Sequence, residues 1–332
     1  MESYSVSVVL CHHRGDFVDR AVETLIGSRG ATPEIIVVTS ELGRTFENAK
    51  TVYHDGGPSE KRNIGFKYCS NQFIAFFDDD VEVDRDCLYE LCRSIDKPDV
   101  GMTYGKTYNM ERRRNFDGAG SFLTSTGFLW AREESGILDE GQYDVEEPVF
   151  AGKGACMMLK RKVFSEVGYF DAYYGILAEE TDISWKCWLA GYKVMYVPKA
   201  ILYHAFNTRF KPWNYFYTHK RVYFHGSRNY LVMLTKCLEW QNVLLMVPQT
   251  MGMWFMAGAG MFLGKKWKAG WLIWCGIGAY FIDLPIILDK RRRTQALRKV
   301  SDKILFRSIM RNPGWSYFFK RVVNYWKTGI HG

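Results

Sequence analysis

Short apolar runs alternate with amphipathic stretches over about the first 210 residues of the chain. Residues 6–10, 33–39 and 73–77 are rich in β-branched and aromatic side chains, which predicts three buried strands. Apolar residues recur at helical spacing elsewhere, and the predicted helices cover residues 16–28, 59–68 and 84–94. Strands that alternate with helices predict an α/β domain with a mostly parallel sheet, in which ligands bind at the carboxyl ends of the strands.

The pattern changes after about residue 212, where two long apolar segments begin. Residues 243–263 contain no charged side chain, and residues 269–288 contain only Asp283. Each segment is long enough to cross a hydrocarbon core of about 30 Å. A basic tail, residues 290–332, follows them. The sequence therefore predicts an α/β domain over residues 1–215 and a helical, membrane-associated region over residues 216–332.

Two arrangements of the apolar segments are compatible with the sequence. In one, they form a membrane hairpin with both ends on the cytoplasmic side, because the basic run at residues 290–293 follows the positive-inside tendency. In the other, they lie in the membrane interface or pack on the first domain, which suits Pro248, Asp283 and Pro285 better. We expect membrane association, either across the bilayer or at its surface.

Composition and charge narrow the class of protein. The 332 residues are 47% hydrophobic and 24% charged, which excludes disorder as the main state. The net charge of +8 gathers beside the apolar segments, and no nucleic-acid-binding motif is present, so an anionic membrane surface is the expected partner rather than nucleic acid. The eight cysteines show no CxxC spacing, and the first residues lack a signal-peptide pattern. We expect the first domain to lie in the reducing cytoplasm.

Two acidic clusters carry the candidate chemistry. Asp78, Asp79 and Asp80 directly follow the apolar run at residues 73–77, and three adjacent acids are expected to need a divalent cation such as Mg²⁺ or Mn²⁺. Such a cation would stabilise a diphosphate leaving group. The second cluster, around Glu180, opens a predicted helix, where acids also complement the helix dipole. One of its carboxylates is a candidate general base toward a hydroxyl.

An ordered set of motifs resembles the family 2 glycosyltransferases of the GT-A fold, including the rhamnosyltransferase-like enzymes. The resemblance covers about residues 5–235. Its motifs are the helix start Gly57-Pro-Ser-Glu-Lys-Arg62-Asn63-Ile-Gly65, the DxD-type Asp78 to Asp80, the acceptor-side residues 154–171, the ED-x-D motif Glu179-Glu180-Thr-Asp182, the strand at residues 191–204, and Arg228-Asn229 with Lys236. The last group is similar to a segment that precedes membrane helices in many members.

This resemblance implies a GT-A catalytic domain over residues 1–215, with a Rossmann-like, mostly parallel sheet flanked by helices. It implies that Glu180 is the catalytic base, with Glu179 and Asp182 shaping the site. The implied nucleotide-sugar ligands are Asp78, Asp79, Arg62, Thr39 and Ser40. Asp80 and His204 are the implied ligands of Mg²⁺ or Mn²⁺, although a histidine after a strand is also a common structural hydrogen bonder.

Three departures from the family pattern are visible. Thr39-Ser40 stands where the family usually has an acid after the second strand, and Glu180 stands where the usual base is Asp. After the first strand the chain reads Cys11-His-His-Arg14, so His12 and His13 are either nucleotide contacts or loop residues. Asp117, further along the chain, is expected on the acceptor side.

The expected function is that of an inverting, metal-dependent glycosyltransferase. It would move a single sugar, since no QxxRW motif of processive synthases is present, from a nucleotide-sugar donor to a hydroxyl. The acceptor would be a lipid-linked or cell-envelope glycan at the cytoplasmic membrane face. Two alternatives remain at this point: a polyprenyl-phosphate sugar synthase, and an inactive GT-A membrane scaffold.

Overall fold

The computed structural model describes residues 3–133, 136–205 and 215–314. The chain divides into two compact units. The first comprises Met1–Ser121, Ala131–Tyr173 and Glu179–Asn207; the second comprises Phe122–Trp130, Tyr174–Ala178 and Thr208–Gly332. The second unit thus includes two short segments that interrupt the first unit along the chain. All eight cysteines are free.

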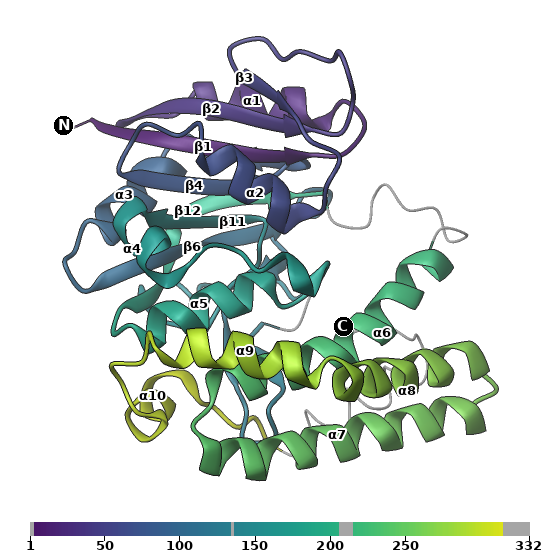
Figure 1. Cartoon of the computed structure of the whole chain (residues 1–332). Coiled ribbons are helices and arrows are strands. Elements are labelled where there is room, and N and C mark those ends of the chain that lie inside the picture. Colours follow the sequence, from purple (N-terminus) through teal and green to yellow (C-terminus); the bar gives the residue numbers. More distant parts are fainter. Residues whose placement is uncertain (1–2, 134–135, 206–214, 315–332) are drawn as a thin grey trace. The chain divides into compact units, whose positions relative to one another are not determined.

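The first unit is built on a mixed sheet with the strand order β10-β12-β6-β11-β4-β1-β2-β3, along which β5 pairs with β12 and β7 with β6 (Figure 1). The strands are β1 (Tyr4–His12), β2 (Ala31–Thr39), β3 (Lys50–Tyr53), β4 (Phe73–Asp78), β5 (Val81–Val83), β6 (Val100–Asn109), β7 (Phe116–Gly118), β10 (Glu147–Pro148), β11 (Cys156–Lys160) and β12 (Lys193–His204). The three predicted strands are confirmed as β1, β2 and β4. They pair in parallel, whereas β11 runs antiparallel between β4 and β6.

Helices cover both faces of this sheet, which is the GT-A arrangement that the sequence predicted. Alternate residues of β1, such as Val8, form one core with α1 (Phe17–Ile26) and α3 (Cys87–Ile95). The opposite face of the sheet contacts α2 (Pro58–Phe66), α4 (Arg161–Val167) and α5 (Glu179–Leu189). The helices predicted at residues 16–28, 59–68 and 84–94 are therefore confirmed as α1, α2 and α3.

Gly65 explains how α2 comes close to the sheet. A Cβ atom at this position would lie 2.4 Å from Cγ1 of Val9 and 3.1 Å from Cγ2 of Val38. Only glycine leaves room for this approach of helix to strands. One turn earlier in the same helix, Arg62 is 2% exposed, so the close packing of α2 fixes this arginine inside the unit.

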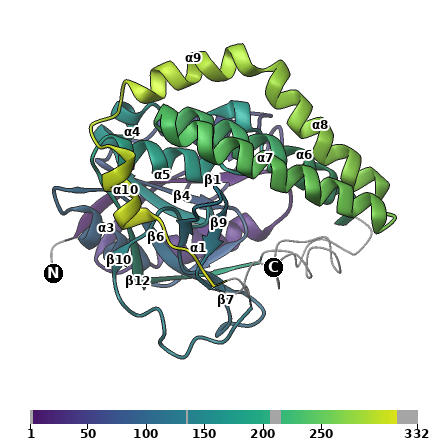
Figure 2. The same cartoon turned by 90° about the horizontal axis from the view of Figure 1, so that it is seen from below.

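The second unit is helical. Its helices are α6 (Tyr215–Cys237), α7 (Trp240–Leu263), α8 (Trp267–Ile282), α9 (Leu284–Gln295) and α10 (Asp302–Ile309). Helices α6, α7 and α8 contact one another, and α8 meets α9 at a bend of 67° (Figure 2). The end of the predicted basic tail, from residue 315, lies outside the described residues.

By length and composition, α7 is the one described helix that could cross a membrane, and α8 with α9 would make a second, broken span. The predicted apolar segments, residues 243–263 and 269–288, fall on these helices. This is a weak indication of membrane association, because core helices of soluble proteins meet the same criteria.

Asn229, in the motif with Arg228, stabilises the turn at residues 174–178 within the second unit. The Asn229 side-chain amide is buried and lies within hydrogen-bond distance of the carbonyl oxygens of Tyr174, Ile176 and Leu177, at 3.0, 2.8 and 2.8 Å. Leu177 and Ala178 both have positive φ angles, 67° and 75°, which are strained for residues with a side chain. The buried amide thus stabilises a strained turn that directly precedes Glu179 in the chain.

Candidate active site

Asp78, Asp80 and His204 come together at the ends of three strands of the first unit. Asp78 ends β4 and His204 ends β12, while β5 pairs antiparallel with the last residues of β12. This pairing brings the backbone oxygen of Asp80 to 2.9 Å from the amide nitrogen of Ala205. His204 Nε2 lies 3.2 Å from Asp80 Oδ1 and 3.9 Å from Asp78 Oδ2. One ligand atom from each of the three residues falls within 4.8 Å of the others.

The donor set of this cluster fits a divalent cation. Two carboxylates and one imidazole suit Mn²⁺, and the carboxylates suit Mg²⁺. Burial alone would lower the pKa of His204, but its hydrogen bonds to Asp117 and Asp80 raise that pKa to about 10. The clustered acids therefore stabilise positive charge at this point of the site, which a bound cation would also supply.

Arg62 connects this acidic cluster to the start of α5. Its guanidinium donates to Asp78 Oδ1 at 3.1 Å and to Glu179 Oε1 at 3.3 Å, and both bonds are shielded because the arginine side chain is only 3% exposed. A buried guanidinium needs such carboxylate partners. Residues from α2, β4 and α5 are thus joined in a single charged network.

Glu180 is half-buried beside this network. A Cβ atom at Gly154 would lie 3.2 Å from Arg62 Nη2 and 3.9 Å from Glu180 Cβ, so Gly154 leaves this space open. Burial, and then the charge of Glu179, raise the pKa of Glu180 to about 8 against the opposing effect of Arg62. A carboxylate of raised pKa is a stronger base than an ordinary glutamate.

Asp182 and Asp79 have different surroundings. Asp182 is fully buried and pairs with Lys186 at 3.5 Å, and the Lys186 ammonium donates to the backbone oxygens of Gly168 and Tyr169 at 3.0 and 2.7 Å. The Asp182 side chain therefore lies in the interior of the unit. Asp79 accepts a hydrogen bond from the backbone N–H of His13 at 3.2 Å, which ties the end of β4 to the end of β1.

Thr39 and Ser40, at the end of β2, belong to a polar cluster with His12 and Lys61. Thr39 Oγ1 lies 2.8 Å from His12 Nδ1, and the ammonium of Lys61 donates to Ser40 Oγ and to the backbone oxygen of His12, both at 2.6 Å. Burial lowers the pKa of both His12 and Lys61. The sequence alone did not single out Lys61, although its place beside Arg62 in α2 was a signal.

Residues 73–284 match the family model described as glycosyl transferase family group 2. The chain belongs to this family. Among curated relatives, a pre-mycofactocin glycosyltransferase of Mycobacterium tuberculosis strain CDC 1551 is 26% identical over 166 residues, which are 48% of this chain and 32% of the relative. A poly-beta-1,6-N-acetyl-D-glucosamine synthase of Staphylococcus aureus strain MSSA476 is 24% identical over 207 residues, 58% of this chain and 48% of the relative.

This family 2 chain thus spans about a third of the first relative and about half of the second. Its fold is similar to that of solved structures. TarS 1-349 of S. aureus superposes with a TM-score of 0.53 at 13% identity, covering 99% of this chain and 92% of TarS. A mannosyltransferase from Pyrobaculum calidifontis, in complex with GDP-Man and Mn²⁺, superposes with a TM-score of 0.50 at 11% identity over 84% of this chain and 87% of the other.

The sequence did not predict the position of Asp117. It had been expected on the acceptor side, but the structure turns it toward the metal-ligand group, where it accepts a hydrogen bond from His204 Nδ1 at 2.8 Å. Burial raises the pKa of Asp117. The hydrogen bond from His204 and the charge of Lys153 lower this pKa more strongly, so it lies below its usual range. No local spacing could reveal this pairing across 87 residues.

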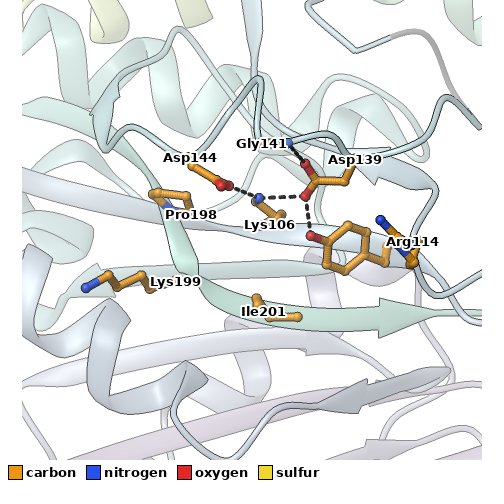
Figure 3. Close-up of a pocket in the computed structure, with 9 residues that line it drawn as sticks. Lys106, Arg114, Asp139, Gly141, Asp144, Pro198, Lys199 and Ile201 are labelled. Atoms are coloured by element: carbon orange, nitrogen blue, oxygen red, sulfur yellow. Dashed lines mark hydrogen bonds and ion pairs between the residues drawn. The ribbon is translucent and has the colours of Figure 1, made fainter.

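A pocket of about 470 Å³ lies on the opposite face of the same strands (Figure 3). Lys106 pairs with Ile201 across β6 and β12, so both project away from the face that carries His204. The Lys106 ammonium lies 2.7 Å from Asp139 and also contacts Asp144. The lysine and the two aspartates form ion pairs that connect the loop at residues 139–144 to β6. None of the predicted site residues lines this pocket.

Proposed function

We propose that this protein is an inverting, metal-dependent glycosyltransferase that moves a single sugar from a nucleotide-sugar donor to a hydroxyl. One observation carries the proposal: Arg62 bonds both Asp78, in the metal-ligand group, and Glu179, which is adjacent to Glu180. The residues suited to a diphosphate and the candidate base thus belong to one network within one unit.

In the proposed reaction, the nucleotide-sugar binds at Asp78, Asp79 and Arg62, with the polar end of β2, Thr39 and Ser40, beside it. Asp80 and His204, together with Asp78, would hold Mn²⁺ or Mg²⁺, and the bound ion supplies positive charge that stabilises the leaving diphosphate.

Glu180 accepts the proton of the acceptor hydroxyl. The hydroxyl oxygen then bonds to the anomeric carbon as the bond from that carbon to the diphosphate oxygen breaks on the opposite face, which inverts the centre. Glu179 acts on Glu180 through its charge, and the buried Asp182 shapes the start of α5.

We further propose that the acceptor is a lipid-linked or cell-envelope glycan and that the reaction takes place at the cytoplasmic face of a membrane. The apolar helix α7 and the exposed apolar side chains along it support this location. The curated name of the S. aureus relative describes the synthesis of a polysaccharide, which agrees with a glycan product. Because a lipid phosphate acceptor is already ionised and needs no base, the half-buried Glu180 favours a hydroxyl acceptor.

The test is a donor panel with the full chain in detergent. UDP-, GDP- and dTDP-sugars are supplied with Mn²⁺ or Mg²⁺ and membrane-lipid or glycan acceptors, and the released nucleoside diphosphate is measured. We expect release from one donor, its loss with a chelator and in Asp80→Asn, and loss of acceptor-dependent transfer in Glu180→Gln with donor binding retained. Asp144→Asn, which removes a carboxylate on the opposite face of the strands, is the matched control and should behave as wild type.

Two results would overturn the proposal. A folded protein that neither binds nor turns over any donor would be an inactive scaffold. Transfer to a polyprenyl phosphate that Glu180→Gln leaves unchanged would make the protein a polyprenyl-phosphate sugar synthase and would remove the role of Glu180 as base.

A further inference from the structure

We infer that Asp117 is a positioning residue for the metal ligand His204, and that Lys153 is the counter-charge that holds Asp117 in place. The inference rests on the proposed metal-dependent function and adds residues beyond the ligand group itself. It concerns the orientation of a ligand, and it is independent of which sugar or acceptor the protein uses.

The two nitrogens of His204 face different partners. Nδ1 lies 2.8 Å from Asp117 Oδ2, whereas Nε2 faces Asp80 at 3.2 Å and Asp78 at 3.9 Å. A carboxylate can only accept, so Nδ1 carries a hydrogen that it donates to Asp117. Loss of the proton on Nε2 leaves a lone pair that is directed toward the two acids, where a metal ion would bind.

The position of Asp117 follows from the pairing of β7 with β6. In β7, Phe116 packs its ring 5.7 Å from that of Tyr108, on the face of β6 that also carries Lys106. A register shift of β7 against β6 leaves Asp117 between this pair and the pair of Gly118 with Thr107, and its carboxylate meets His204 on the opposite face. Asp117 is only 3% exposed there, which would be costly for a carboxylate without partners.

Lys153 supplies the second partner. Its ammonium forms an ion pair with Asp117 Oδ1, so that both oxygens of this buried carboxylate are engaged. The lysine reaches Asp117 past Gly118, where an added Cβ would lie 3.2 Å from both Cγ and Cδ of Lys153. Glycine at this position leaves room for the aliphatic part of the lysine side chain.

A carboxylate that receives the second ring N–H of a metal-bound histidine fixes the ring orientation and increases the basicity of the ligand nitrogen. Loss of such a partner typically weakens metal binding by about 10–100-fold. Asp117 is thus expected to act on metal affinity, while the donor and acceptor contacts of the site stay unchanged.

The experiment measures the Kd for Mn²⁺ on the full chain without donor, by the electron paramagnetic resonance of free Mn²⁺. Asp117→Asn is expected to raise this Kd by about 10–100-fold, Lys153→Met to raise it less, and Asp117→Glu to restore part of the affinity. Saturating Mn²⁺ should recover most of the turnover of these variants. Asp139→Asn, which breaks a buried aspartate–lysine pair on the opposite face of β6, is the matched control and should leave the Kd unchanged.

Thermal unfolding shows whether each variant is folded, and Lys153→Met tests the same link if Asp117→Asn does not fold. A wild-type Kd in the folded variants would overturn the inference and leave the proposed function intact. Wild-type protein that transfers sugar but binds no Mn²⁺ or Mg²⁺ would overturn both the metal dependence and the inference.

Discussion

Two buried charged residues of the first unit have partners of opposite charge on two sides. Arg62 has carboxylates on two sides, and Asp117 has a histidine on one side and a lysine on the other. Charges removed from water need such partners, since an uncompensated buried charge is strongly destabilising. Glu180 differs, because the nearest charge on its own helix, Glu179, has the same sign. Burial, and then this like charge, raise the pKa of Glu180, which suits the proposed role of a base.

The pH dependence of transfer tests this electrostatic argument. The pKa of Glu180 is raised to about 8, so the residue is protonated below that pH and cannot accept a proton from the acceptor. We expect kcat/KM for the acceptor to rise with pH and to level off above about pH 8. Glu179→Gln removes the like charge, so its rising limb is expected to lie at lower pH than in wild type.

The measurement is a pH series of initial rates at saturating metal and donor, with donor binding checked at each pH. A wild-type limb near the ordinary pKa of glutamate, about 4.3, would contradict the environment described for Glu180. A Glu179→Gln limb at the wild-type position would exclude the charge of Glu179 as a cause.

At the scale of elements, the site depends on how closely α2 lies against β1 and β2. The strand and helix predictions located these elements well, because each has a local apolar period. Their distance from each other was not in the sequence pattern. It is decided by Gly65, whose missing side chain lets the helix that carries Lys61 and Arg62 approach the sheet.

Gly65→Ala is therefore expected to be destabilising. Alanine in a helix interior is better than glycine by about 1 kcal/mol. Overpacking typically costs about 1–3 kcal/mol, and a Cβ 2.4 Å from Val9 Cγ1 has no room without a shift of the helix. We expect the strain to prevail, which lowers the free energy of unfolding and weakens donor binding through Arg62.

Gly252→Ala in α7 is the matched control. A Cβ at Gly252 meets no atom within 4 Å, so only the helix propensity changes and the substitution should be neutral or stabilising. Urea unfolding of both variants gives the comparison. A Gly65→Ala protein as stable as wild type, with wild-type donor affinity, would show that α2 can move away without consequence.

At the scale of the whole molecule, the second unit carries an apolar surface on α7. Leu245 and Met256, three turns apart on this helix, are 66% and 65% exposed. Exposed apolar side chains along one face of a helix are typical of a surface that contacts lipid. This surface is the structural basis for the proposed location at a membrane.

Vesicle binding tests that location. The double variant Leu245→Glu and Met256→Glu should bind vesicles with anionic lipids at least about tenfold more weakly, because burying a charge in the apolar phase is unfavourable. Leu42→Glu, which places the same charge at an exposed apolar residue of the first unit, should bind as wild type. Cosedimentation of the full chain with the vesicles measures the difference; equal binding of all three proteins would exclude α7 as the membrane contact.

The sequence by itself determined the features that have a local signature. The alternation of apolar runs defined β1, β2 and β4 with their helices, and the acids at Asp78 to Asp80 marked the end of a buried strand. Ordered motifs along the chain were enough to indicate the family, to which the family model also assigns the chain. These features can be recognised in the sequence because side-chain periodicity and adjacent charge are properties of neighbouring residues.

Tertiary structure alone decided which distant residues meet. His204 faces Asp80 because β5 pairs with β12, and Asp117 faces His204 because β7 and β12 flank β6 in a fixed register. Arg62 joins Asp78 to Glu179 only after α2 has packed on the sheet. Strand register and helix packing are set by the sum of many contacts across the core, so the pairing of these charges could not be obtained from their spacing in the chain.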